Sequence, residues 1–541
     1  MKVVNNLVKS IDGLGIMKGR KAFTDDFSEK DTLIIKVLRS PYAYARIISV
    51  DDEKAKKLEG VEMILTHKDF KRIPFTRAGQ GYPEPSPHDK FVLDEYVRYV
   101  GDEVLAVVGR NDEVCKKALD LIKVEYEVLD AVLDFEKAKD NPIIIHPEKE
   151  IHEMFDIGFK PERNIAASYG MEIGDVKKSL EESDYVIKET FYTQAQAHVM
   201  LEPHTVNARM DYQNRLVLYS STQTPFHIRR IISQGLEIPL SKIRVIKPRV
   251  GGGFGGKQAI HGEMLVAYVT YKTGKPAKMV YTRKEVFESS YSRHPMRVDL
   301  ALGADKDGNL KAIDCEVLSD TGAYGEHALT VFMVTGSKVL PLYNKVDSVR
   351  FAGDIVYTNH TPAGAYRGYG AIQGNFALES AIDILCEKMG MDPILFRQKN
   401  MMKEKETSPI FEIMGEGTAG TAMIMETCKL DECVKKGIEL IGWKDKYPRI
   451  ETKDKIRSVG MAIAMQGSGI PYIDMGSATI KLNDDGFYNL MVGATEIGQG
   501  SDTVLTQIAA EELMTDVDKV VIYSSDTDLT PFDVGAYASS T

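Results

Sequence analysis

Alternating apolar and polar positions predict a small mixed domain at the start of the chain. Strands are expected where every second residue is apolar, at 33–40, 45–50, 61–65, 102–109 and 123–128. The segment 52–60 (DEKAKKLEG) predicts a helix closed by Gly60, and 111–122 (NDEVCKKALDLI) predicts a second helix. Residues 1–133 are therefore predicted to form one α/β domain. Residues 134–164 combine proline, charge and weak periodicity, which indicates a linker.

The rest of the chain contains a weak internal repeat. Each copy reads as strand, polar loop, helix, strand and glycine-bearing loop, first from 215 to 257 and again from 488 to 541. Thr224 and Ser501 stand where a helix N-cap is expected in the two copies. Two related domains, 165–405 and 406–541, are therefore predicted, with their loops meeting in a cleft between them.

The most distinctive stretch is RVGGGFGGK at 249–257, with five glycines in six positions. It satisfies two nucleotide-binding patterns, GxGxxG and GxxxxGK, but Gln258 replaces the hydroxyl residue that the second pattern needs. A helix is expected to begin near Ala259, and the glycines are expected to let an anionic cofactor approach the backbone. A nucleotide-binding protein remains the alternative at this point.

Two further loops have a similar character. The segment 362–374 (PAGAYRGYGAIQG) places Arg367 and Tyr369 between glycines, and 495–500 (TEIGQG) precedes a predicted helix. An arginine among small residues can bind a phosphate, although an exposed turn arginine is the ordinary interpretation when such a loop stands alone.

Composition and charge narrow the class of protein. A chain of 541 residues exceeds a single core, and its net charge of −11 argues against nucleic-acid binding. No apolar run is long enough for a signal peptide or a membrane span, so a cytoplasmic protein is expected. The five cysteines are scattered without a CxxC pair, which excludes a disulfide scaffold and the usual zinc or iron–sulfur spacings.

Four motifs taken together resemble a known family. In chain order they are KVLRSPYAYARI, GGGFGGK, AYRGYG and TEIGQG. They resemble the molybdenum-binding large subunit of the xanthine dehydrogenase and aldehyde oxidase family, and the likeness extends from about Gly19 to the last residue. The resemblance implies a mixed α/β (α+β) fold, with an N-terminal hammerhead domain followed by two molybdopterin-binding domains, the second incomplete.

The resemblance also implies site residues. It assigns the cofactor site to eight positions: Gln196, Gly252, Gly253, Phe254, Gly255, Arg367, Gln499 and Ala538. It assigns substrate contacts to Gln258 and Tyr369. No side chain is expected to bind the metal, because the dithiolene of the pterin holds molybdenum in this family.

The implied activity is hydroxylation of an N-heteroaromatic (purine-like) or aldehyde substrate with oxygen from water. The cofactor is expected to be molybdenum–molybdopterin, in the cytosine dinucleotide form. Because the chain has neither a flavin motif nor the cysteine pattern of an iron–sulfur protein, 2Fe–2S clusters and FAD are expected on partner subunits.

The glutamate that acts as base in the family has no match in this sequence. Glu496 is interpreted as a cap for the turn before a helix, so no catalytic residue is assigned. We expect a separate C-terminal molybdopterin-binding polypeptide or a truncated product, and no hydroxylation by this chain alone. A cofactor-holding or inactive fragment is the alternative.

Overall fold

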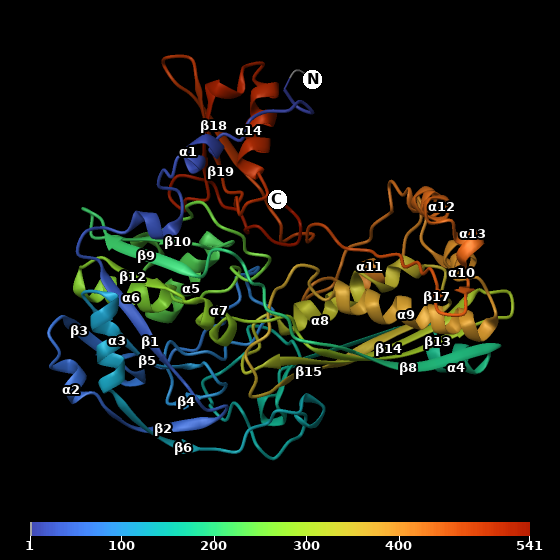
Figure 1. Cartoon of the computed structure of the whole chain (residues 1–541), viewed down its shortest axis with the longest axis horizontal. Coiled ribbons are helices and arrows are strands. Elements are labelled where there is room, and N and C mark those ends of the chain that lie inside the picture. Colours follow the sequence, from blue (N-terminus) through green and yellow to red (C-terminus); the bar gives the residue numbers. More distant parts are fainter. Residues whose placement is uncertain (1–2) are drawn as a thin grey trace.

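The computed structural model describes residues 3–541, and its first large element is a seven-stranded sheet (Figure 1). In spatial order the strands are β11 (Ile243–Ile246), β10 (Leu216–Ser220), β9 (Thr205–Met210), β12 (Ala277–Val280), β1 (Leu33–Arg39), β5 (Glu103–Gly109) and β3 (Val61–Leu65). The N-terminal strands therefore continue the sheet of the first repeat copy, through parallel pairing of β1 with β12. The sheet crosses the boundary predicted at residue 133.

Alternation along the strands decides which helices cover the two faces of this sheet. Ile35 and Val37 of β1 point into a core shared with α5 (Pro225–Leu236) and α6 (Glu263–Thr273). Ile34 of the same strand packs on the other side, in a core that includes α3 (Asp112–Leu121). This is the period-two pattern that the sequence shows.

The predicted N-terminal elements are confirmed, with one shortened helix. All five predicted strands form, as β1, β3 and β5 above and as β2 (Ala45–Asp51) and β6 (Lys123–Val128), which pair with each other. Helix α3 begins after Asn111, whose side chain accepts a hydrogen bond from the Val114 amide at 2.9 Å. Helix α2 (Glu53–Lys56) ends before the predicted end, although Gly60 has the expected left-handed φ of 94°.

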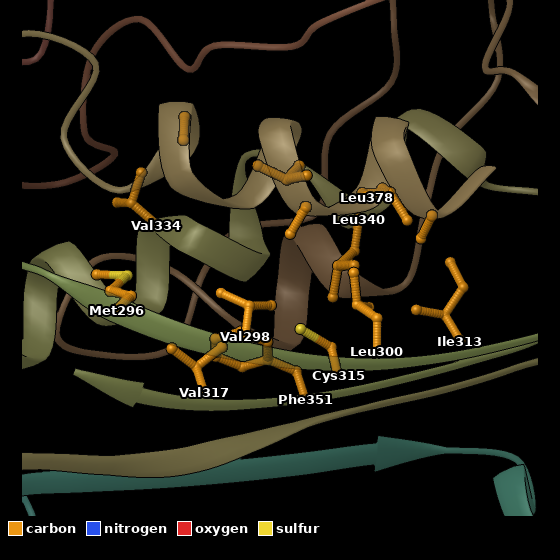
Figure 2. Packing of buried hydrophobic residues seen from close by; sticks show 14 of the residues in the cluster. Met296, Val298, Leu300, Ile313, Cys315, Val317, Val334, Leu340, Phe351 and Leu378 are labelled. Carbon is orange, nitrogen blue, oxygen red and sulfur yellow. The ribbon is translucent and has the colours of Figure 1, made fainter. Parts of the chain in front are cut away.

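A second sheet supports the other half of the molecule. Its five strands, in spatial order, are β7 (Ile165–Ile173), β15 (Ser348–Tyr357), β14 (Leu310–Gly322), β13 (Met296–Ala304) and β8 (Tyr185–Thr193). Helices α8 (Ala328–Ser337) and α9 (Ala371–Met389) lie on one face, where Val334 and Leu378 meet apolar side chains from the strands (Figure 2). Burial of each such side chain stabilises the fold by about 1.5–3 kcal/mol.

The predicted internal repeat is confirmed as two units with the same topology. In each unit the middle strand is antiparallel to the strand before it and parallel to the strand after its helix. The second unit consists of β18 (Ala478–Leu482), β19 (Tyr488–Val492), α14 (Ser501–Glu512) and β20 (Val520–Ser524). The units meet edge to edge, because Ile246, the last residue of β11, forms a bridge to Asp526, which follows β20.

The start of the chain lies against this second unit. Gln507 of α14 donates hydrogen bonds to the carbonyls of Val3 and Asn6, and Figure 1 shows α1 beside the same unit. The outward side of α14 stays open, with Val504 51% and Ile508 45% exposed.

The remaining elements are short or peripheral: β4 (Tyr96–Val97), β16 (Ile450–Glu451), β17 (Ile456–Arg457), α1 (Gly13–Met17), α4 (Val176–Glu181), α7 (Arg283–Ser289), α10 (Pro393–Asn400), α11 (Ile410–Ile413), α12 (Leu430–Ile441) and α13 (Trp443–Lys446). The predicted linker 134–164 contains only two 3-10 turns, η3 (Phe135–Lys137) and η4 (Pro161–Arg163), besides extended chain. Within residues 3–541, no helix has the length and apolar character to cross a membrane.

Candidate functional site

A cavity of about 790 Å³ lies where the two repeat units, the N-terminal segment and helix α8 of the second half meet. This volume falls in the range of sites for cofactors and drug-sized ligands. Most of its lining comes from four loops, which contribute residues 249–255, 365–369, 497–499 and 536–539. The structure thus brings together the three motif loops that the sequence singled out, with seven of the eight predicted cofactor residues among the lining residues.

The glycines of the first loop are explained by neighbouring protein atoms, which corrects the expectation that a ligand excludes their side chains. A Cβ on Gly253 would lie 2.3 Å from the Gln223 Oε1, and one on Gly255 would lie 2.5 Å from the Ala365 carbonyl oxygen. Gly252 and Gly255 also have φ values of 86° and 96°, which disfavour other residues. The loop is therefore wedged between two other segments, and the cavity lies on its remaining side.

The nucleotide-binding alternative fails on geometry. Lys257, the lysine of the GxxxxGK pattern, is fully buried and its ammonium contacts the Glu202 carboxylate at 2.7 Å. The predicted helix near Ala259 is also wrong, because α6 begins only at Glu263 after a buried turn. Neither a phosphate-binding lysine nor a helix N-terminus therefore follows the loop.

Glu202 instead fixes the glycine loop from beneath. Its Oε2 accepts hydrogen bonds from the Gly251 amide at 2.7 Å and the Ser221 hydroxyl at 2.8 Å, besides its ion pair with Lys257. Burial lowers the pKa of Lys257, although the Glu202 charge opposes that effect. Removal of one partner from such a buried ion pair typically lowers the stability of the fold by about 3–5 kcal/mol.

The lining offers donors that suit an anionic cofactor. Within residues 3–541, the amides of Gly252, Gly253 and Phe254 donate no hydrogen bond, whereas those of Gly251 and Gly255 are both used. Unbonded backbone N–H groups at a concave surface are typical of anion sites. Three unbonded N–H groups in a loop that lines the cavity are therefore a donor set that suits a phosphate-bearing cofactor.

Two arginines add positive charge beside the same loop. The Arg367 guanidinium lies 5.6 Å from the centre of the Phe254 ring and forms no ion pair within the described part of the chain. Behind it, Arg293 is buried, donates to the Arg367 carbonyl at 2.8 Å and keeps Nε and Nη1 without hydrogen-bond partners. Burial lowers the pKa of Arg293. Cations without carboxylate partners favour an anion in the cavity.

The loop 495–500 is organised by Glu496, which confirms its interpretation as a cap. The Glu496 carboxylate accepts hydrogen bonds from the amides of Gly498, Gly500 and Asp502, at 2.6, 3.1 and 3.2 Å. Burial acts to raise the pKa of Glu496, but these amide hydrogen bonds outweigh it and the pKa is lowered. Ser501, predicted as the N-cap, is instead the first residue of α14.

Gln499 lines the cavity, but its side chain is engaged inside its own loop. Its Oε1 accepts a hydrogen bond from the Ile497 amide at 2.6 Å, and its Nε2 donates to the Thr495 carbonyl at 2.9 Å. The Gln499 side chain therefore stabilises the conformation of its own loop. Ala538 also lines the cavity and has a left-handed φ of 50°.

The predicted glutamine is misplaced. Gln196 is exposed and does not line the cavity, whereas Gln223 is 2% exposed and does. The Gln223 Oε1 accepts from the Gly255 amide at 3.0 Å, and its Nε2 donates to the Ala536 carbonyl at 2.6 Å. Gln223 thus joins the loops of the two repeat units. The internal repeat could have identified Gln223, because TQTP in the first copy occupies the place of TEIGQG in the second copy.

Both predicted substrate residues line the cavity. The Tyr369 hydroxyl hydrogen-bonds to His327 Nδ1 at 2.7 Å and to the Thr330 hydroxyl at 2.5 Å, which fixes the orientation of the ring. Gln258 donates through Nε2 to the Gly79 carbonyl at 3.0 Å, so its Oε1 remains an acceptor. Sequence patterns missed Glu416, a buried carboxyl that lines the same cavity from the loop after α11.

Comparisons with known proteins assign the domains. Residues 18–130 match the family model "Aldehyde oxidase and xanthine dehydrogenase, a/b hammerhead domain", and residues 159–401 and 436–541 match models for the "Molybdopterin cofactor-binding domain". The chain is 38% identical to probable hypoxanthine oxidase XdhD of Escherichia coli (strain K12), with 100% of this chain and 59% of XdhD covered. It is 35% identical to putative xanthine dehydrogenase molybdenum-binding subunit XdhA of the same strain, with 98% and 68% covered.

Aldehyde oxidoreductase of Desulfovibrio gigas is a structural neighbour, with a TM-score of 0.85 at 24% identity, covering 98% of this chain and 57% of the neighbour. That likeness shows the fold. The chain belongs to the xanthine dehydrogenase and aldehyde oxidase family of molybdopterin-binding proteins. The predicted fold, a hammerhead domain followed by molybdopterin-binding domains, is confirmed. The chain spans 59% of the length of XdhD.

Proposed function

We propose that this chain holds the molybdenum cofactor of a hydroxylase that acts on an N-heteroaromatic or aldehyde substrate. The observation that carries the proposal is the cavity beside the glycine loop, where the three unbonded amides of Gly252, Gly253 and Phe254 meet the unpaired cation of Arg367. When bound, the cofactor supplies the two-electron redox centre for transfer of a water-derived oxygen to carbon.

The chain's own residues bind and orient. The amides at 252–254 and Arg367 hold the anionic groups of the cofactor, and the Phe254 ring shapes the wall. Gln223 and Glu496 keep the loops of the two units in place, through the hydrogen bonds described above. Tyr369 and Gln258 orient the substrate, because a fixed aromatic ring and a free amide oxygen suit a flat, polar heterocycle.

The finer expectations remain parts of this proposal. The cytosine dinucleotide form of the pterin is one, and electron transfer to 2Fe–2S and FAD partner subunits is another. XdhA is itself named as a subunit, which supports separate partners. Because XdhD and XdhA are longer than the aligned region, we propose that the base for proton abstraction lies in a segment outside these residues, for instance on a separate C-terminal molybdopterin-binding polypeptide.

The test is cofactor analysis of the chain purified with its co-purifying partners. We expect molybdenum and a released pterin nucleotide in equal amounts, and chromatography of that nucleotide identifies its form. Bound ATP or NAD without molybdenum would contradict the proposal. A sample that contains cofactor but hydroxylates nothing when every partner is present would support the alternative of a cofactor-holding protein.

A further inference from the structure

Glu416 occupies an unusual place in the cavity wall. It follows α11 and is 9% exposed, and its carboxyl forms no hydrogen bond with any group among residues 3–541. Its one ion-pair partner in the described part of the chain, Lys338, lies 3.8 Å away, which is beyond hydrogen-bond distance. A carboxyl that the described residues leave without a hydrogen bond is free to bind a ligand in the cavity that it lines.

The backbone holds this carboxyl in position. Gly417 has a left-handed φ of 87°, and a Cβ there would lie 2.6 Å from Pro85 and 3.1 Å from the Thr330 methyl group. The Gly417 amide also contacts the Met333 sulfur at 3.2 Å, so the loop is pressed against α8. The backbone next to Glu416 is therefore held close to Thr330, which in turn hydrogen-bonds to the Tyr369 hydroxyl.

Other polar residues line the same cavity. Tyr537 lines it, and its hydroxyl is buried without a hydrogen-bond partner among the described residues. Gln258 contributes a free Oε1. The charged and titratable groups that act on Glu416 are Lys338, from the end of α8, and Asp474, while the hydroxyls of Tyr369 and Tyr537 lie within its electrostatic reach.

Resting on the proposed function, we propose that Glu416 recognises the substrate and makes the site specific for heterocycles that carry a ring N–H beside a carbonyl or a second ring nitrogen. A protonated carboxyl offers one O–H donor and one carbonyl acceptor on the same edge. That pair matches the acceptor and donor of such a ring edge in two antiparallel hydrogen bonds. Tyr369 then flanks the plane of the ring.

The protonation state of Glu416 agrees with this geometry. Burial raises the pKa of Glu416 to about 7, against the opposing effect of Lys338. Below pH 7 the group therefore has a proton to donate, and above it the carboxylate can only accept. A simple aldehyde can accept a hydrogen bond from Glu416 but has no N–H to offer, so it would leave the carbonyl oxygen of the Glu416 carboxyl without a donor.

The experiment measures binding apart from turnover, on the cofactor-loaded protein with its partners and without an electron acceptor. Calorimetric titration with hypoxanthine compares the parent with Glu416→Ala, Glu416→Gln and the control Glu412→Gln, an exposed residue of the same segment. We expect the alanine variant to weaken binding on the order of 10- to 100-fold. Glutamine keeps a donor and an acceptor, so its affinity should stay within about fivefold at pH 6, and the control should not change.

A pH series keeps the test decisive if the alanine variant does not fold. Between pH 6 and pH 8 hypoxanthine should bind the parent progressively more weakly, while the Glu416→Gln variant should show no such loss. Equal pH dependence in both proteins, or an alanine variant within threefold of the parent, overturns the proposal. Molybdenum content and turnover of benzaldehyde are measured on the same samples. If those fail while binding still depends on Glu416, then the proposed reaction fails and the recognition role stands.

Discussion

Replacement of Gly255 by alanine tests the glycine loop most sharply. The new Cβ would lie 2.5 Å from the Ala365 carbonyl oxygen and 2.8 Å from its carbon, and these are backbone atoms that cannot rotate away. The residue would also adopt a φ of 96°. Left-handed backbone costs a non-glycine residue about 1–2 kcal/mol, and overpacking adds roughly 1–3 kcal/mol. Together they amount to about 2–5 kcal/mol.

The loss should also reach the cofactor. Relief of the clash separates the loop from segment 365–367, which breaks the hydrogen bond from the Arg367 amide to the Phe254 carbonyl (2.9 Å) and the one from Tyr291 to the Gly255 carbonyl. The matched control is Gly274→Ala, where φ is 70° but no atom lies within 4 Å, so only the backbone term of about 1–2 kcal/mol applies.

The assay combines denaturant unfolding of both variants with molybdenum content per chain. We expect Gly255→Ala to be less stable than Gly274→Ala and to contain less than a tenth of the parent's molybdenum, while the control keeps its cofactor. If Gly255→Ala matches the control in both measurements, then the contact with Ala365 does not hold the loop and the reasoning is refuted.

Three further predictions follow from the site and its surroundings. Tyr369→Ala should raise KM for flat heterocycles about fivefold more than for small aliphatic aldehydes, since stacking contributes about 1 kcal/mol, and Tyr369→Phe should keep the preference; equal losses would remove the ring from the substrate site. The Glu496 pKa is lowered by folding, so its stabilisation is present above the ordinary glutamate pKa and disappears as pH falls through the folded-state value. Glu496→Gln should therefore unfold more easily at pH 7, by about 1–3 kcal/mol, and the difference should shrink at pH 3; a constant difference argues against the charge. Double replacement of Val504 and Ile508 by serine should reduce self-association in sedimentation experiments without loss of stability, because both side chains are about half exposed. Unchanged association would show that the outward face of α14 does not mediate self-association.

Regular strands were predictable because burial on a sheet leaves a period of two in the sequence. The strands β3 and β6 coincide with their predicted segments, and the Asn111 cap marked the start of α3. The wrong prediction of a helix directly after the glycine loop also arises from a pattern of buried residues. Ala259 and Ile260 are buried as a helix would bury them, but they lie in a turn packed under the loop, and helix α6 starts at Glu263.

The sequence motifs predicted which loops line the cavity, but they did not predict the contacts that hold those loops in place. A run of glycines shows that side chains are excluded, but it cannot show whether a ligand or the Ala365 carbonyl excludes them. Gln223 was overlooked because its role depends on a hydrogen bond to Ala536, 313 residues away. Glu416 carries no local pattern at all, since its position depends on a loop pressed against α8 by contacts that are remote in sequence.

The central claim is that the cavity beside the Gly252–Phe254 amides holds a molybdenum cofactor. The most direct measurement is elemental analysis of the protein purified through a tag on this chain, from cells that make the cofactor and express its partners. The account predicts about one molybdenum atom per chain in the parent and in Gly274→Ala, with nearly complete loss in Gly255→Ala. Absence of molybdenum from the parent, or the same content in all three proteins, would contradict it.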